Sequence, residues 1–413
     1  MGSESANKTR EYGDLVFTLT SSYHAVWNDR GSGATRNGAF WHPNIQGELR
    51  PLGDIAVGSF DSPEGKRAAL LVGAKPGTLA SDKPPVASPT DYKWIWDDRS
   101  SGAKANGSVW RPIPPNGYVA MGDVARDGWD KPSTDKIWCL REDLIAYGRY
   151  EEKSVWDDTR SGGEFSVSVW NIIPTSVGVN GSEMIPIIAG TFKASQSLSD
   201  EPDLGYAIVP VLKVPKDYKK FDSPVPSISA DELPEAGTSY PRQEQCRVEL
   251  PFTAFFPATD RESLAKIKDP FCTVTRSMAW YVDAVYVNNS EGTVARTKSI
   301  RTGISKEDSA SMTHSAGISI TSSAGVSVEG VFSAGISITL NYQFTYSNTI
   351  TFTEFQEHTV TETFTVPPYN AIVLFAKHIW ITGKRSDGSV STGQVDFNAN
   401  DDLRLSGIEL KRN

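Results

Sequence analysis

Residues 316–352 alternate between apolar and polar side chains with a period of two. The even-numbered positions are nearly all apolar, whereas the odd-numbered positions are Ser, Thr, Gly, Asn, Gln and one Glu, with Val331 as the only apolar residue among them. Successive side chains of a β-strand point to opposite faces. The segment is therefore predicted to form strands with one apolar face and one face rich in hydroxyl groups.

The same stretch carries almost no charge. Between Ser309 and Thr353 the only formal charge is that of Glu329, although charged residues make up 22% of the chain. A solvated strand face normally carries Lys, Glu and Arg, while a strand of a membrane barrel alternates between a lipid-facing apolar side and a polar lumen side over about 9–11 residues. Residues 317–328 and 331–342 are each long enough to cross a bilayer as strands.

A tight turn at Glu329 and Gly330 joins these two arms, since glycine readily adopts the positive φ of hairpin turns. We predict that the hairpin inserts into a membrane. The residues assigned to its lipid-facing side and its tip are Ile318, Ile320, Val326, Val328, Glu329, Gly330, Phe332, Ile336, Ile338 and Leu340. The alternative is a half-buried hairpin in a soluble β-sheet. The length of the alternation and the missing charges favour insertion, because such a segment exposed to water promotes aggregation.

Three related segments occur in the first half of the chain: VWNDRGSGA, IWDDRSSGA and VWDDTRSGG. In each, a second Trp follows the first by 14 residues, and the pairs are Trp27 and Trp41, Trp96 and Trp110, and Trp156 and Trp170. The first two repeats also share a Gly-Asp pair, at residues 53–54 and 122–123, which the third repeat lacks. Three matched copies with frequent Gly, Pro and Asp turns predict all-β structure and a pseudo-threefold assembly of small sheets.

These repeats resemble the vacuolar protein sorting-associated protein 62 family over residues 13–212. The resemblance implies a β-prism, in which three antiparallel sheets surround a threefold axis, and we expect it to act as a recognition domain. Residues 213–244 follow as a linker rich in Pro, Ser and charge. Residues 245–413 form the second predicted domain. It opens with one helix, where Thr259 and Glu262 form a capping box and Asp269-Pro270 ends the helix.

Residues 272–402 resemble the membrane-insertion module of aerolysin-type β-pore-forming toxins, with long Ser- and Thr-rich strands and an amphipathic hairpin. The resemblance implies an elongated antiparallel module that binds a target-cell receptor through its partner domain, forms a homo-oligomer and inserts a shared transmembrane β-barrel. It also suggests a defensive or insecticidal toxin. Many such toxins are activated by a protease, and the candidate cleavage points are Lys219-Lys220, Arg242 and Lys411-Arg412. For each of them taken singly, solvation of the basic side chain is the favoured explanation.

The repeat loops allow two interpretations. In the first, they bind a sugar or lipid headgroup of the receptor through an aromatic ring with adjacent carboxylates and amides, and three copies provide avidity. The residues assigned to this role are Asp29, Arg30, Asp98, Arg99, Asp158 and Arg160. In the second, the Asp and Gly residues shape turns and the first Trp of each repeat fills the core, which we favour for the tryptophans. A calcium site at Asp97 and Asp98 is disfavoured, because no full oxygen-ligand loop is visible.

Several functional classes are disfavoured by composition. The net charge of −9 argues against nucleic acid as a partner. The five histidines are scattered without the spacing of metal ligands, and no nucleophile elbow occurs, so we expect no metal, no cofactor and no enzymatic activity. Three cysteines are too few for a disulfide framework, and Cys246 and Cys272 either pair or remain buried thiols.

The N-terminal residues lack the apolar core of a signal peptide, and no apolar stretch has the length of a transmembrane helix. We therefore expect the protein to accumulate in the cytoplasm of the producing cell and to act at a target cell membrane after release. The expected partners are that membrane, a surface receptor (glycan, lipid or protein), further copies of the chain and an activating protease. The alternative function is a lectin-like or lipid-binding adaptor of membrane trafficking that does not insert.

Overall fold

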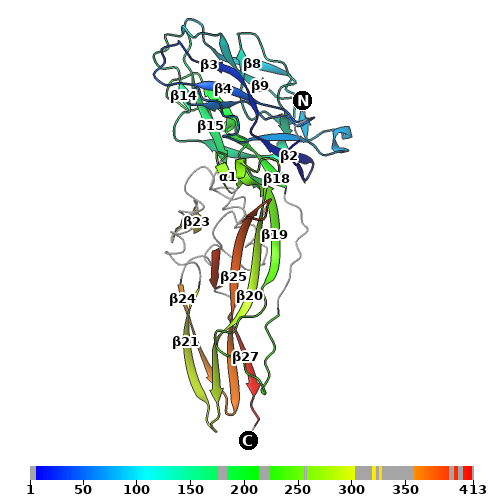
Figure 1. Cartoon of the computed structure of the whole chain (residues 1–413), viewed down its shortest axis with the longest axis vertical. Coiled ribbons are helices and arrows are strands. Elements are labelled where there is room, and N and C mark those ends of the chain that lie inside the picture. The colour runs from blue at the N-terminus through cyan, green and yellow to red at the C-terminus, as the bar shows by residue number, and fades with distance from the viewer. Residues whose placement is uncertain are drawn as a thin grey trace. The chain divides into compact units, whose positions relative to one another are not determined.

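The computed structural model describes residues 6–174, 184–213, 224–254, 256, 258–302, 319–321, 325–327, 358–389, 395–398 and 403–411. Within these ranges nearly all regular elements are antiparallel strands, with one α-helix, α1 (Arg261–Leu264), and four single-turn 3-10 helices. The predicted all-β class is confirmed. None of the described helices has the length and apolar character needed to span a membrane. The chain divides into two compact units (Figure 1), which are described separately below.

The first unit contains three equivalent three-stranded arrangements, one for each repeat. They consist of β3 (Tyr23–Asn28), β4 (Ala39–Pro43) and β5 (Ile55–Val57); of β8 (Asp91–Asp97), β9 (Gly107–Ile113) and β11 (Val124–Asp127); and of β14 (Trp156–Asp157), β15 (Ser168–Pro174) and β17 (Phe192–Ser195). In each one the middle strand carries the second Trp of its repeat. The first Trp in the first two repeats follows a β-bulge, which bends the outer strand.

The remaining strands of the first unit form further sheets. They are β1 (Arg10–Tyr12), β2 (Leu15–Thr20) and β6 (Ala69–Ala74); β7 (Val86–Ala87), β10 (Tyr118–Val119) and β12 (Cys139–Arg141); and β13 (Ile145–Tyr150), β16 (Met184–Pro186) and β18 (Ile208–Lys213). The 3-10 turns of this unit are Thr78–Ala80, Glu142–Leu144, Leu204–Tyr206 and Phe252–Ala254. Strands β13 and β15 pair, so the third repeat is joined to its connecting sheet as one larger sheet.

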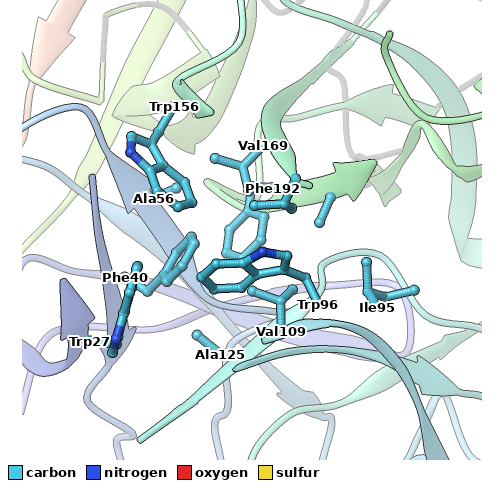
Figure 2. Packing of buried hydrophobic residues seen from close by; sticks show 12 residues of the cluster. Trp27, Phe40, Ala56, Ile95, Trp96, Val109, Ala125, Trp156, Val169 and Phe192 are labelled. Atoms are coloured by element: carbon cyan, nitrogen blue, oxygen red, sulfur yellow. The ribbon is translucent and has the colours of Figure 1, made fainter. Parts of the chain in front are cut away.

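The three first tryptophans of the repeats meet in one core (Figure 2). The ring centroids of Trp27, Trp96 and Trp156 lie 5.4, 5.7 and 5.8 Å apart and the rings meet edge to face, an arrangement that aromatic rings favour. Phe40 and Phe192 stack beside them at 5.1 Å. All five side chains are buried, so the favoured interpretation of the tryptophans as core residues agrees with the structure.

Residues 250–271, here called the connecting segment, also belong to the first unit, although the chain before and after them belongs to the second. Most of its described large apolar side chains are buried, and the Ala68 amide donates to the carbonyl of Ala258 at 2.7 Å. Helix α1 lies in this segment. Its N-cap is Asp260, whose carboxylate accepts from the amide of Ser263 at 2.8 Å, so the prediction of Thr259 as the capping residue is wrong. Aspartate one position later offers the stronger acceptor.

The second unit is built on two long strands, β20 (Phe271–Asn288) and β25 (Asn370–Arg385), which pair along their length with one bulge (Figure 1). They are joined by β19 (Gln243–Pro251), β26 (Val395–Asn398) and β27 (Arg404–Glu409). A separate antiparallel pair consists of β21 (Val294–Thr302) and β24 (His358–Val366). Ile300 and Phe364 of this pair pack among apolar residues of β20 and β25.

Only two short strands are described inside the predicted hairpin, β22 (Ser319–Thr321) and β23 (Gly325–Ser327). They pair with each other, Ile320 opposite Val326. Residues 317–328 were predicted as one continuous arm; in this structure the arm instead reverses direction between Thr321 and Gly325. The predicted turn at Glu329 and Gly330 lies outside the described residues, as do Ile318, Val328, Phe332, Ile336, Ile338 and Leu340.

Two of the three cysteines can be placed. Cys139 and Cys272 are buried thiols, which agrees with the thiol alternative rather than with a Cys246–Cys272 disulfide. Burial raises the pKa of the Cys139 thiol to about 12, against the opposing effect of Lys193. A thiol held protonated in this way is a poor nucleophile.

Candidate functional site

Each repeat loop is closed by its own aspartate. The Oδ1 atoms of Asp29, Asp98 and Asp158 accept from the backbone amide nine residues later, at 3.0, 2.9 and 2.9 Å. All three side chains are buried. These carboxylates therefore hold the loops in shape. Their assignment to receptor binding stays a prediction, in which they act by maintaining the shape of the loop.

Burial changes the acidity of two of these groups. It raises the pKa of Asp29 above its usual range, although the amide of Gly38 and the indole of Trp156 act in the opposite direction. It also raises the pKa of Asp158, against the amide of Val167 and the hydroxyl of Ser161. For each carboxylate, the loss of hydration thus disfavours the ionised form by more than the hydrogen bonds favour it.

The indole N–H groups tie each repeat to the next in a closed cycle. Trp27 donates to the carbonyl of Ala105 at 2.8 Å and Trp96 donates to that of Phe165 at 3.0 Å. Trp156 completes the cycle by donating to the carbonyl of Arg36 at 3.0 Å. The three acceptors occupy equivalent positions in the three loops, so the tryptophans serve both as core and as links between repeats.

The loop backbones form a second cycle. The amide of Lys104 donates to the carbonyl of Arg30, that of Glu164 to the carbonyl of Arg99, and that of Thr35 to the carbonyl of Thr159, at 2.8, 3.0 and 2.9 Å. Thr159 is therefore the equivalent of Arg30 and Arg99. Arg160 instead takes the place of Gly31 and Ser100, and all three have positive φ, at 69°, 93° and 66°. The three predicted arginines are consequently not symmetry equivalents.

The surface of these loops is formed by arginines and neighbouring apolar residues. Arg30, Arg99 and Arg160 are exposed. The guanidinium of Arg30 stacks on the ring of Phe60 at 4.6 Å, and that of Arg99 stacks on Trp129 at 4.8 Å. In such a cation–π pair, a planar guanidinium group covers one face of the aromatic ring and presents a positive charge at the surface.

Sequence reasoning missed Phe60 and Trp129. The Trp129 side chain is 39% exposed, and its Nε1 donates to Asp98 Oδ1 at 2.7 Å, so a carboxylate of the loop fixes its orientation. Phe60 and Trp129 both stand four residues after the alanine of the Gly-Asp-x-Ala motif, and Leu198, 40% exposed, follows Ala194 by the same spacing. Extending the repeat alignment past that alanine would have found them.

The Gly-Asp pairs lie at a buried contact between repeats. Gly53 and Gly122 approach so closely that a Cβ at Gly53 would lie 2.5 Å from the Gly122 Cα, which only glycine permits. Asp54 and Asp123 each accept the backbone amide of an alanine in the following repeat, at 2.8 and 2.9 Å. Their second partners differ between the repeats.

Asp54 is paired with a histidine, and Asp123 with an arginine and a lysine. The Oδ1 of Asp54 lies 2.6 Å from His42 Nδ1. Asp123 bonds Arg111 at 2.9 and 3.0 Å and Lys193 at 3.1 Å. Burial disfavours the ionised form of Asp123, but Lys193 and Arg111 outweigh it and hold its pKa below the usual range. Burial in turn lowers the pKa of Lys193, and Asp123 acts in the opposite direction.

A metal site is not supported by the described part of the chain. No group of three His, Cys, Asp or Glu side chains there is arranged to hold a metal ion. Both oxygens of Asp97 are already used, by the indole N–H of Trp94 at 3.0 Å and by the amide of Arg99 at 3.2 Å. The disfavoured calcium site at Asp97 and Asp98 therefore has no geometric support.

In the second unit, β21 and β24 border the predicted hairpin on both sides. Hydroxyl groups on their exposed face bond across the pair, Thr297 with Thr363 at 3.3 Å and Ser299 with Thr361 at 2.9 Å. The opposite face includes Ile300 and Phe364, which are buried. The two strands thus have one face with hydroxyl groups and one face with buried apolar residues. The hairpin sequence alternates between the same two kinds of residue.

Comparisons with known proteins match both halves of the chain. A family model described as vacuolar protein sorting-associated protein 62 matches residues 1–219, and one described as insecticidal crystal toxin, P42, matches residues 260–396. The two resemblances predicted from the sequence, one for each half, are confirmed. A search of curated protein sequences finds no match.

Two crystal structures are among the solved structures that match the chain. The crystal structure of GNIP1Aa from Chromobacterium piscinae matches with 23% identity and a TM-score of 0.39, and the match covers 48% of this chain and 37% of that one. The crystal structure of Cry35Ab1 matches with 10% identity and a TM-score of 0.38, covering 96% of this chain and 90% of that one. The chain thus spans little more than a third of the length of the first structure and most of the second.

Proposed function

We propose that this chain, which belongs to the vacuolar protein sorting-associated protein 62 family, is an insecticidal-type toxin. In this proposal it binds a target cell surface, oligomerises and forms a transmembrane β-barrel pore. The match of residues 260–396 to the insecticidal crystal toxin P42 family supports a toxin. The finer steps, which are receptor binding, assembly and insertion, rest on the residues discussed next.

The pairing register of β21 and β24 carries the proposal. It runs without interruption from Val294 opposite Val366 to Thr302 opposite His358. Each step forward on β21 is one step backward on β24. If this register continued beyond Thr302, the two strands would meet at Gly330. That residue is the turn predicted independently from the local sequence, which favours a single long hairpin in the inserted state.

The faces of this long hairpin agree along its length. Among the described side chains of β21 and β24, the even-numbered residues are buried or half-buried apart from the exposed Arg296, and the exposed threonines and serine have odd numbers. The apolar residues of 316–352 also have even numbers, apart from Val331. Because the continued register pairs even with even residues, both arms carry their apolar side chains on one face, as a barrel strand pair in lipid requires.

The described pair β22–β23 uses a competing register. Ile320 lies opposite Val326 here, whereas in the continued hairpin Ile320 lies opposite Leu340. The two registers exclude each other, so insertion requires β22 and β23 to separate. A lone hairpin in lipid leaves unpaired backbone groups at a cost of several kcal/mol each, and closure with hairpins of other copies removes that cost. Oligomerisation is therefore part of the proposal.

A matched pair of substitutions tests insertion. We expect Ile336→Asp, on the predicted lipid face, to reduce dye release from vesicles prepared from insect cell membranes by at least about tenfold, because a carboxylate in the bilayer is costly. Ser337→Asp, on the predicted lumen face, should leak like wild type. Circular dichroism and vesicle sedimentation check that both variants are folded and bound. Equal leakage by the two variants would sink the proposal.

A reversible crosslink tests the exchange of registers. The double variant Ile320→Cys, Val326→Cys should, when oxidised, lock β22 to β23 and abolish dye release, which a reductant restores. The matched control, Ile320→Cys, Leu340→Cys, joins residues that face each other only in the continued hairpin, so it should retain release when it is oxidised on the membrane. Binding without leakage in wild type under every activation condition would instead favour the non-inserting adaptor.

A further inference from the structure

A cavity of about 100 Å³ lies within the first unit between the third repeat and the connecting segment. Asn171, Ile172 and Ile173 of β15 and Ile188 form part of its wall, and Ala258 and Thr259 of the connecting segment contribute another part. The volume is that of about three water molecules. The exposed Thr259 lies at the cavity, which is therefore not sealed from solvent.

Thr191, one of the residues that line the cavity, carries a buried hydroxyl group that no described residue bonds. Thr191 is 3% exposed, and its Oγ1 has no hydrogen-bond partner among the described residues. Its methyl carbon would lie 2.9 and 3.1 Å from Cβ atoms built at Gly122 and Gly53, so that side of Thr191 is packed against the other repeats. A buried hydroxyl without a partner normally indicates water or a ligand.

The other polar groups of the wall balance in charge and offer both donors and acceptors. Arg67 and Glu151 carry opposite formal charges, and the amide Nδ2 of Asn171 donates to Glu151 Oε2 at 2.9 Å. Asn171 retains its amide oxygen as an acceptor and Glu151 its second carboxylate oxygen. Three isoleucines supply the apolar part. A neutral ligand fits this wall better than an ion.

We propose that this cavity binds a neutral vicinal diol, the chemistry shared by the edge of a terminal sugar ring and by a glycerol headgroup. Each hydroxyl of a diol both donates and accepts, which matches Thr191, Asn171 and Glu151, and its C–H groups match the isoleucines. The site is separate from the exposed arginine–aromatic pairs of the repeat loops. Its occupancy also touches the connecting segment, which leads into the first residue of β20.

Saturation-transfer difference NMR on the intact chain tests the site without any membrane. The probes are glycerol and the methyl glycosides of glucose, galactose and mannose, each with the wild type, Thr191→Val and Glu151→Gln. We expect transfer to at least one probe, and binding roughly fivefold weaker in Thr191→Val, as for the loss of one hydrogen bond. Thr297→Val, the same change on an exposed strand of the second unit, should leave the signal unchanged.

The probes also separate the two sources of the diol. Transfer to a glycoside but not to glycerol assigns the site to a sugar, and the reverse assigns it to a glycerol headgroup. Absence of transfer to every probe, or an equal signal in Thr191→Val and wild type, overturns the proposal and leaves a cavity filled by water. Because no pore is needed for this measurement, its result is independent of the dye-release experiments.

Discussion

The repeat loops and the β21–β24 pair are both held by polar side chains across antiparallel strands, yet the contacts differ in kind. In the loops, the bonded groups are buried aspartates and indoles that link the repeats in a closed cycle. In β21–β24, they are hydroxyl groups on an exposed face. A buried polar group that loses its partner is costly, whereas an exposed hydroxyl exchanges its partner for water at little cost.

This difference separates a rigid part from one that can rearrange. The loop cycle cannot open at one point without leaving indole N–H groups and carboxylates unpaired in the core. The β21–β24 pair can be extended or shortened without such losses, because each exposed hydroxyl remains solvated. A recognition unit that keeps its shape and a strand pair that can grow are what the proposed pore requires.

The largest effect is expected where the buried charges are. Asp123→Asn leaves Lys193 and Arg111 without a carboxylate, and Lys193 is only 1% exposed. Removing one partner of a buried ion pair typically costs about 3–5 kcal/mol. We expect a loss of this size in the free energy of unfolding, measured by urea titration of tryptophan fluorescence.

The equivalent residue of the first repeat is the control for that prediction. Asp54→Asn removes the carboxylate beside His42, but the imidazole Nδ1–H can still donate to the amide oxygen that replaces it. The loss should therefore be smaller than in Asp123→Asn. Equal losses in the two variants would show that the shared backbone bonds, rather than the cations, determine the cost.

Hydrogen exchange should show the contrast between the two regions directly. The backbone amides of β8 and β9 lie beside the tryptophan core, whereas those of β21 and β24 lie in a pair with one solvated face. We expect the free energy of opening to be lower in β21–β24 by at least about 2 kcal/mol in native-state amide exchange. Equal protection of the two pairs would contradict the view that β21–β24 is the part that rearranges.

The sequence predicted well those features that recur along the chain. The spacing of the tryptophans indicated the shared core, and the alternation in 316–352 agrees in parity with β21 and β24. It was a poor guide to Lys193, which lies in the repeat that lacks the Gly-Asp pair and bonds an aspartate 70 residues earlier. A buried lysine is rare unless it is paired, and the residues around Lys193 in the sequence do not indicate its distant partner.

The loop arginines show a second limit. Alignment by residue type suggests that Arg30, Arg99 and Arg160 are equivalents, but alignment by backbone hydrogen bonds places Thr159 in that position. Positive φ is uncommon outside glycine, yet Ser100 and Arg160 both adopt it, so the displacement by one residue leaves no clear mark in the sequence. The connecting segment is a third case, since its return to the first unit depends on contacts far apart along the chain.

The smallest effect separates the shape of a loop from its charge. Asp158→Asn keeps an acceptor for the Val167 amide and can donate to Ser161, but it removes a charge whose burial is unfavourable. Because the folded pKa of Asp158 is raised, its contribution to stability is complete below the unfolded value of about 3.8 and is lost as the pH rises through the folded value. At about pH 7 the variant should therefore be at least as stable as wild type, and any gain comes from removing a charge whose burial is unfavourable.

That gain should vanish near about pH 3.5, where the aspartate of the wild type is largely protonated in both states. Urea titrations at the two pH values measure the difference. A variant that is less stable than wild type at neutral pH would mean that the carboxylate is more than a hydrogen-bond acceptor, and the receptor-binding interpretation of Asp158 would then lose its simplest test. If stability is kept, any loss of cell-surface binding in the same variant reports on the charge alone, and the loop can be assigned to recognition without an effect on folding.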